Sequence, residues 1–198
     1  MTSWASPIVV NTGSRFELIL NATPLVVSYD PETGEELWSV ECLMGEVGPS
    51  PAYADGIVFA VNQYALLAAI NIETKQIVWE AYDDLPDAPC PLATDRFLIL
   101  PTSYGVVTCF NAKNGDIYWT HEFDKGFYSS PILVGDKVYL MDRSGVTHIF
   151  MAGEEFVSLG DLQLGERSDT TPAFKDGRIY IRGKSHLFCI GNQDEQQG

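Results

Sequence analysis

The chain has 198 residues, with 27 acidic side chains against 12 basic ones and a formal net charge of −15 at pH 7. Its 45% apolar and 20% charged residues are typical of a globular protein with a sizeable core. A field this negative repels nucleic acid and anionic lipid, and no apolar run approaches the roughly 20 residues of a membrane span, so neither a nucleic-acid partner nor a span is expected.

A repeat of about 40 residues organises the chain. Its first marker is a small residue followed by a proline, and these prolines stand at positions 7, 51, 91, 131 and 172, which gives spacings of 44, 40, 40 and 41. Trp38, Trp79 and Trp119 keep the same period, with spacings of 41 and 40. Two independent markers that share one period predict iterated structural modules.

Each module is predicted to hold short β-strands joined by tight turns. In the fourth unit the apolar runs 132–134, 138–140 and 146–151 alternate with Gly, Asp and Ser, and in the third unit the run 116–119 carries the tryptophan. No stretch has the 3.6-residue apolar period of a helix. Four strands in about 40 residues is the size of a β-propeller blade, which buries its faces against neighbouring blades. The sequence therefore predicts an all-β fold of four-stranded antiparallel blades.

Five units can be delimited along a propeller segment over residues 1–192. The blades are expected at residues 3–44, 45–85, 86–125, 126–165 and 166–192. The fifth unit stops after its third strand, where Asn192 stands at the same position within the repeat, which we call its phase, as Asn71 and Asn111. The polar residues 193–198 are expected to form a disordered tail.

Four complete blades and a three-stranded fifth predict an open arc or part of a larger ring. We therefore expect the C-terminal part of a longer propeller, without a secretory signal of its own. Open blade edges favour self-association or a protein partner.

The residue before each repeat proline is always small. Ser6, Ser50, Cys90, Ser130 and Thr171 occupy this position, as expected where inner strands crowd around an axis. A cysteine that replaces a serine there indicates a steric role rather than a metal ligand. The other cysteines are Cys42, Cys109 and Cys189, and all four are predicted to be buried free thiols.

A third recurring feature is the segment that leads to each tryptophan. An Asp or Asn caps a turn, a Gly takes the left-handed backbone conformation, and the Trp is expected to pack between blades. The residues of this blade-docking set are Asp30, Gly34, Trp38, Asn71, Trp79, Asn111, Gly115 and Trp119. The pattern weakens in the fourth unit, where Leu159 is counted at the tryptophan phase.

This pattern resembles the tryptophan-docking motif of the pyrroloquinoline-quinone-like (quinoprotein) β-propellers, and the resemblance covers residues 3–192. It extends to the outer-membrane assembly propeller lipoproteins, which are non-enzymatic. The resemblance implies a ring of six to eight blades and a periplasmic or other extracytoplasmic location, although the residues themselves leave the compartment undecided.

The same resemblance raises an enzymatic alternative, a part of a quinone-dependent alcohol or sugar dehydrogenase. Those enzymes hold the quinone and calcium on the propeller axis, beside an adjacent-cysteine disulfide and a stacking tryptophan. The chain has no Cys-Cys pair and three of its four tryptophans stand at the docking phase, so no cofactor is predicted and pyrroloquinoline quinone with calcium belongs to the alternative alone. His121, His148 and His186 lie at three different phases, so neither a metal site nor a catalytic residue is predicted.

The loops vary from blade to blade, as recognition loops on a rigid scaffold do. Aromatic, amide and cationic residues in these loops and ahead of the first strands form a candidate recognition surface of Trp4, Gln63, Tyr64, Tyr104, Tyr128, Arg143 and Lys184. The leading hypothesis is a non-catalytic scaffold that mediates protein–protein interaction through loops and blade edges. A sensor domain that binds a small ligand on the axis is a further alternative.

Overall fold

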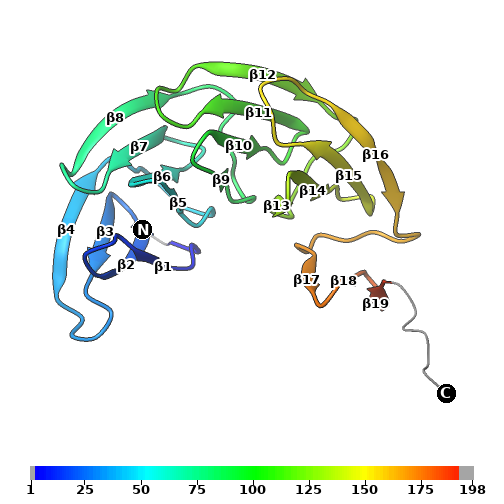
Figure 1. Ribbon diagram of the computed structural model, residues 1–198, viewed down its shortest axis with the longest axis horizontal. Coiled ribbons are helices and arrows are strands. Elements are labelled where there is room, and N and C mark those ends of the chain that lie inside the picture. Colours follow the sequence, from blue (N-terminus) through cyan, green and yellow to red (C-terminus); the bar gives the residue numbers. More distant parts are fainter. Residues whose placement is uncertain (1–2, 192–198) are drawn as a thin grey trace.

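The computed structural model describes residues 3–191, which form five antiparallel sheets and, within that range, no helix. Figure 1 shows the sheets side by side in an arc around a common centre, and the arc does not close into a ring. The strands β4, β8, β12 and β16 follow its outer rim (Figure 1). The prediction of all-β propeller blades in an open arc is confirmed.

Each sheet follows the order of its strands in the chain. Blade 1 contains β1 (Ile8–Asn11), β2 (Phe16–Ala22), β3 (Leu25–Tyr29) and β4 (Glu36–Glu41). Blade 2 contains β5 (Ala52–Ala54), β6 (Ile57–Val61), β7 (Leu67–Asn71) and β8 (Gln76–Ala81). Blade 3 contains β9 (Leu92–Ala93), β10 (Phe97–Pro101), β11 (Val106–Asn111) and β12 (Ile117–Glu122).

The last two sheets differ from each other in strand number. Blade 4 contains β13 (Ile132–Val134), β14 (Lys137–Met141), β15 (Val146–Met151) and β16 (Ser158–Gln163). Blade 5 has three strands, β17 (Ala173–Lys175), β18 (Arg178–Arg182) and β19 (Leu187–Ile190). Asn192 and the tail 193–198 lie outside the described residues.

The core lies between blades rather than inside one of them. Between blades 2 and 3, Phe59 and Val61 of β6 face Leu98 and Leu100 of β10, and all four are fully buried. Because strand residues alternate between the two faces of a sheet, each blade has one apolar set for the preceding blade and one for the next. Complete burial of one such side chain contributes about 1.5–3 kcal/mol.

The small residues before the repeat prolines link neighbouring blades by hydrogen bonds. The backbone N–H of Ser6 donates to Ser50 Oγ (2.9 Å), that of Ser50 to Cys90 Sγ (3.2 Å), that of Cys90 to Ser130 Oγ (3.0 Å) and that of Ser130 to Thr171 Oγ1 (2.9 Å). The sequence interpretation gave this position only a steric role. The structure adds a second role, because the side chains of Ser50, Cys90, Ser130 and Thr171 each accept a hydrogen bond from the blade before them.

Two tryptophans dock onto the next blade. The indole N–H of Trp79 donates to Ala112 O (3.0 Å) and that of Trp119 to Gly153 O (2.9 Å). The Trp79 ring lies over Gly115, where an added Cβ would approach it to 2.7 Å, so this turn requires glycine. The preceding side chain of each turn acts as a cap, since Asn111 Oδ1 accepts the N–H of Lys113 at 2.9 Å.

The other cap residues do the same in their own turns. Asp30 accepts the N–H groups of Glu32 and Thr33, and Asn71 accepts those of Glu73 and Thr74. Gly34 has a φ of +75°, in the left-handed region predicted for it.

Trp38 makes a different contact from the other two. Its indole N–H donates to Oε2 of Glu17 (2.7 Å), which also accepts from Ser28 Oγ (2.8 Å). Glu17 is only 2% exposed, and its other oxygen accepts from Arg15 Nε at 2.9 Å. Burial alone would raise the pKa of this carboxyl, but the hydrogen bonds from Ser28, Trp38 and Arg15 outweigh it and lower the pKa. The ionised carboxylate therefore holds the tryptophan of blade 1.

The fourth unit corrects one prediction. Cross-strand pairing places Gly160 opposite Ile149, as Trp119 stands opposite Cys109, so Gly160 and not Leu159 occupies the tryptophan phase. The turn between β15 and β16 is one residue longer than the turn between β11 and β12, which shifts the count. Blade 4 thus has no indole to dock on blade 5, and the ring contact between Tyr139 and Phe174 at 4.9 Å joins them instead.

The four cysteines are free thiols but not all are buried. Cys109 is buried, Cys42 and Cys90 are partly exposed, and Cys189 is exposed on β19, contrary to the prediction. Burial raises the pKa of Cys109 to about 12, which keeps this thiol protonated.

Candidate functional site

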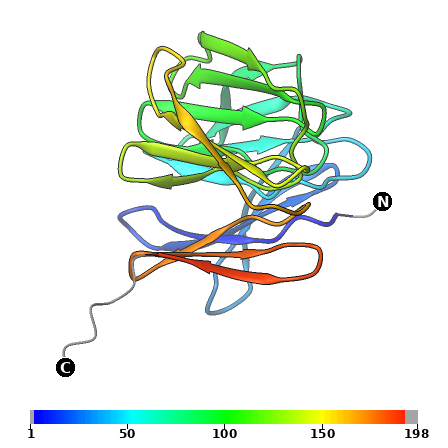
Figure 2. The same ribbon diagram turned by 90° about the vertical axis from the view of Figure 1, so that its right-hand side faces the viewer.

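The connections of the blades emerge on two opposite faces. Because the strands of each sheet alternate in direction, the loops between second and third strands emerge beside the connections from one blade to the next. We call this side the loop face, formed by residues 3–7, 23–24, 42–51, 62–66, 82–91, 102–105, 123–131, 142–145, 164–172 and 183–186. Figure 2 views the strands from the side, with the blue segment before β1 at the loop face. The opposite face carries the tight two-residue turns such as 135–136 and 176–177.

All seven residues of the candidate recognition surface lie on the loop face. The four aromatic members, Trp4, Tyr64, Tyr104 and Tyr128, expose 72%, 62%, 52% and 41% of their surface. Gln63, Arg143 and Lys184 stand in the loops after β6, β14 and β18. Exposed aromatic side chains on a rigid scaffold are the residues that anchor protein partners.

The structure brings three of these residues together at blades 1 and 2. Trp4, Gln63 and Tyr64 line one cavity of about 290 Å³ with Glu46 and Asp87. The N–H of Trp4 donates to Val47 O (2.8 Å), which fixes the backbone of Trp4 beside this cavity. Aromatic faces beside two carboxylates suit a cationic side chain, and Oδ1 of Asp87 is buried without a hydrogen-bond partner.

Further along the face, Tyr104 and Tyr128 are held by polar neighbours. The hydroxyl of Tyr104 donates to Asp84 Oδ1 (3.1 Å), and burial together with the Asp84 charge raises the pKa of this tyrosine to about 12. The guanidinium of Arg143 lies over the Tyr128 ring at 4.0 Å and its Nε pairs with Asp169 Oδ1 at 3.1 Å. These contacts orient Tyr104, Tyr128 and Arg143, which were candidates only because their loops differ from blade to blade.

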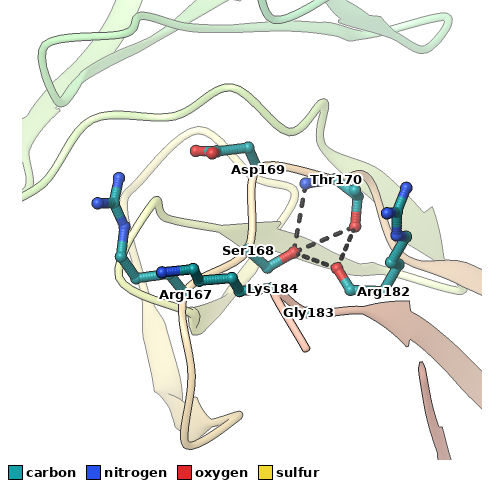
Figure 3. A pocket seen from close by; sticks show the side chains of 7 residues that line it. All are labelled: Arg167, Ser168, Asp169, Thr170, Arg182, Gly183 and Lys184. Atoms are coloured by element: carbon teal, nitrogen blue, oxygen red, sulfur yellow. Dashed lines mark hydrogen bonds between the residues drawn. The ribbon is translucent and has the colours of Figure 1, made fainter. Parts of the chain in front are cut away.

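Lys184 lines a different cavity, at the inner end of blade 5 on the loop face. This cavity of about 380 Å³ is lined by Arg167, Ser168, Asp169, Thr170, Arg182, Gly183 and Lys184. Figure 3 shows the side chains of Arg167 and Lys184 on one side of Ser168 and that of Arg182 on the other. A neighbouring cavity of about 310 Å³ shares Arg167 and adds Lys125 and Arg143.

Sequence reasoning missed one cluster, a histidine pair at the rim of blades 3 and 4. His121 and His148 line one cavity of about 530 Å³, although they stand at different phases of the repeat. His121 comes from the fourth strand of its blade and His148 from the third strand of the next, and these two strands are neighbours in a propeller. That rule could have identified the pair. His186 lies elsewhere, with Nδ1 at 3.3 Å from Glu166 Oε2.

In the histidine cavity, the imidazole of His148 lies between two carboxylates. His148 Nδ1 lies 2.8 Å from Asp161 Oδ1, and its Nε2 lies 3.4 Å from Asp142 Oδ2. His121 stacks on Phe156 with ring centroids 3.8 Å apart; its burial lowers the pKa of His121, and the charge of His148 lowers it further.

Ser144, which lies in the loop beside His148, is not activated as a nucleophile. Ser144 Oγ donates to Asp142 Oδ1 (2.7 Å) rather than to His148, and Asp142 also accepts the N–H of Val146. These bonds close the loop after β14 in the way that an aspartate closes a turn. Among residues 3–191, no three His, Cys, Asp or Glu side chains are placed to hold a metal ion together.

The blades, their docked tryptophans and the hydrogen-bonded small residues before the repeat prolines define a β-propeller segment, whose repeats resemble those of the pyrroloquinoline-quinone-like propellers. Within that class, the sequence model of the family described as "Outer membrane protein assembly factor BamB" matches residues 83–159. A protein of that name from Yersinia pestis is 25% identical over 147 residues, which cover 73% of this chain and 36% of the relative. Both sequence comparisons thus support the resemblance to propellers of the outer-membrane assembly kind.

A solved structure gives the same fold. BamB from Moraxella catarrhalis superposes with a TM-score of 0.73 at 17% identity, over 95% of this chain and 59% of that one. The chain therefore spans 36% of the length of the Yersinia pestis relative and 59% of the Moraxella catarrhalis chain. No part of residues 3–191 forms a helix long and apolar enough to cross a membrane.

Proposed function

We propose that this chain is a non-catalytic scaffold segment that binds a protein partner through its loop face. The observation that carries the proposal is the gathering of Trp4, Tyr64, Tyr104 and Tyr128, all exposed, on one face of a rigid set of blades. Aromatic rings lose little conformational entropy on binding and offer large contact areas, so their exposure on one face favours an interface.

The names of the similar proteins support the same class of function. The Yersinia pestis relative is named an outer membrane protein assembly factor, BamB, and the Moraxella catarrhalis structure is also of a BamB, so the partner we propose is a protein of an assembly machinery rather than a small substrate. The same resemblance supports an extracytoplasmic location, on the periplasmic side of an outer membrane.

The tryptophans and carboxylates of this chain do not favour the quinone-dependent alternative. Trp79 and Trp119 are used to dock blades and Trp38 binds Glu17, so none of these three is available to stack on a quinone. A calcium ion needs several oxygen ligands that converge on one point, and the described residues offer no such cluster of carboxylates. We therefore assign no step of quinone chemistry to this chain.

Site-specific photocrosslinking tests the proposed function. A photoreactive phenylalanine analogue is placed at Tyr64 or Tyr128 on the loop face, and at Asp136 or Lys175 on the opposite face as controls, in cells that express the protein. We expect the loop-face positions alone to crosslink to a partner protein, identified by mass spectrometry. Equal crosslinking from both faces, or none from the loop face, would contradict the proposal.

A further inference from the structure

The loop face has an uneven distribution of charge. At blades 4 and 5 two cavities of about 380 and 310 Å³ share Arg167, and we call them together the cationic double cavity. Its cationic side chains are Lys125, Arg143, Arg167, Arg182 and Lys184. These are five of the 12 basic residues in a chain of net charge −15, so the surrounding composition does not account for them.

Within residues 3–191, four of these five cations have no carboxylate partner. The one carboxylate that lines the double cavity, Asp169, pairs with Arg143. Glu166 lies nearby, but its carboxylate accepts the backbone N–H groups of Ser185 and His186. In the described part of the chain, Lys125, Arg167, Arg182 and Lys184 therefore line the double cavity without an internal counterion.

The backbone that carries these cations is held in place. Ser168 is buried, and its hydroxyl donates to Arg182 O (2.8 Å) while it accepts the N–H of Thr170 (3.3 Å) (Figure 3). The N–H of Lys184 donates to Arg167 O (2.9 Å). The connection before β17 and the loop after β18 are thus joined, so the bases of the cationic side chains are fixed.

Blade packing does not explain Arg182. The corresponding last residue of the second strand is Val61, Pro101 or Met141 in blades 2 to 4, and each of these is buried. In blade 5 an exposed arginine stands at this otherwise apolar phase. A guanidinium with its five donors suits a carboxylate, which it can bind through two parallel hydrogen bonds.

We propose that the cationic double cavity binds an extended acidic segment of the partner protein, with its carboxylates at Arg182, Lys184 and Arg167. This inference rests on the proposed function and names the chemistry of the partner. Cations spread over two adjoining cavities match carboxylates spaced along a peptide better than one compact anion. A nucleic acid or an anionic membrane carries many negative charges over a large surface and would be repelled by the net charge of −15. A short acidic segment interacts mainly with the cations beside it, because salt screens the interaction between charges that are more than about 8 Å apart.

Fluorescence anisotropy with the full chain tests this inference. The probe is a fluorescein-labelled peptide of alternating aspartate and glycine, and its matched neutral probe has asparagine in place of aspartate. The test variant is Arg182→Gln/Lys184→Gln. Its control is Lys137→Gln/Lys175→Gln, which makes the same change in net charge at two exposed lysines on the opposite face. Thermal unfolding of each variant verifies that it folds, and Arg167→Gln is the second test variant.

We expect the wild type and the Lys137→Gln/Lys175→Gln control to bind the acidic probe, and the Arg182→Gln/Lys184→Gln variant to bind it about ten-fold more weakly. Added salt weakens the binding, and the neutral probe does not bind. Equal binding of both probes, or an equal loss in the control variant, overturns the inference. So does binding to phosphatidylglycerol vesicles in place of the peptide.

The two proposals can fail separately. If the acidic probe does not bind while Tyr64 and Tyr128 still crosslink to a partner, the acidic segment is wrong and the scaffold function stands. If those positions do not crosslink, the scaffold function is wrong whatever the probe does.

Discussion

Blade 3 and blade 5 derive from the same repeat but are buried differently. In blade 3, Leu98 and Leu100 face blade 2, Ile99 faces blade 4, and all three are fully buried. In blade 5, Ile181 is buried toward blade 4, whereas Tyr180 and Leu187 on the other face are exposed. Whether an apolar residue of a propeller is buried therefore depends on the neighbouring blade. An apolar residue at the same position of the repeat stabilises the fold by different amounts in different blades.

The largest expected effect compares one covered position with one uncovered position. Phe59→Ala removes a fully buried ring between blades 2 and 3, and we expect it to lower the free energy of unfolding by about 3–5 kcal/mol through lost burial and a cavity. Leu187→Ala, at a side chain that is 75% exposed, is expected to change it by less than about 0.5 kcal/mol. Urea unfolding followed by circular dichroism measures both.

A second pair keeps this test usable if Phe59→Ala does not fold. Ile99→Val, in the interface of blades 3 and 4, is expected to cost about 0.5–1.5 kcal/mol. A cost at Leu187 as large as that at Phe59 would mean that the exposed face of blade 5 is covered in solution, which would contradict the comparison.

The repeat period was sufficient to predict the blades, because a module that cannot bury its own faces must recur. Counting along the chain failed where turn length changes, and this is why Leu159 was assigned the phase that Gly160 occupies. The role of Cys90 as a hydrogen-bond acceptor was not predictable from its size alone. The pairing of His121 with His148 was missed because the prediction compared phases within one blade, whereas the contact joins two blades.

The loop face was predicted only as a set of residues. Variable loops identified Trp4, Gln63 and Tyr64 as candidates, but their common cavity depends on how blade 1 meets blade 2. Arg167 and Arg182 gave no signal in the sequence, because neither stands in a loop that was compared between units. Their proximity to Lys184 follows from the hydrogen bonds between the connection before β17 and the loop after β18.

A smaller effect is expected at two glycines of equivalent turns. Gly115→Ala places a Cβ at 2.7 Å from the Trp79 ring and in a left-handed conformation of φ +78°, and we expect it to cost about 2–4 kcal/mol. Gly34→Ala has the same conformational strain at φ +75° but no atom within 4 Å of the new Cβ, so about 1–2 kcal/mol is expected. Thermal and urea unfolding compare the two variants.

The same substitution in a Trp79→Ala variant separates the backbone strain at Gly115 from the steric clash with the Trp79 ring. There the ring is absent, so the additional cost of Gly115→Ala should fall to that of Gly34→Ala. If Gly115→Ala cost as much in that variant as in the wild type, the Trp79 ring would not be in steric contact with this turn. The difference between the covered turn at Gly115 and the uncovered turn at Gly34 would then lose its support.

The smallest expected effect concerns the hydrogen-bond ladder between blades. Cys90→Ala leaves the N–H of Ser50 without its acceptor, and we expect a loss of about 1 kcal/mol in the free energy of unfolding. Ser6→Ala is its matched control, because the Ser6 hydroxyl accepts no hydrogen bond within residues 3–191, and it should be close to neutral. Cys90→Ser restores an acceptor at the same place and should recover the stability. If Cys90→Ser were as unstable as Cys90→Ala, the position would act through packing of the sulfur, and the ladder would not distinguish inner blades from the end of the arc.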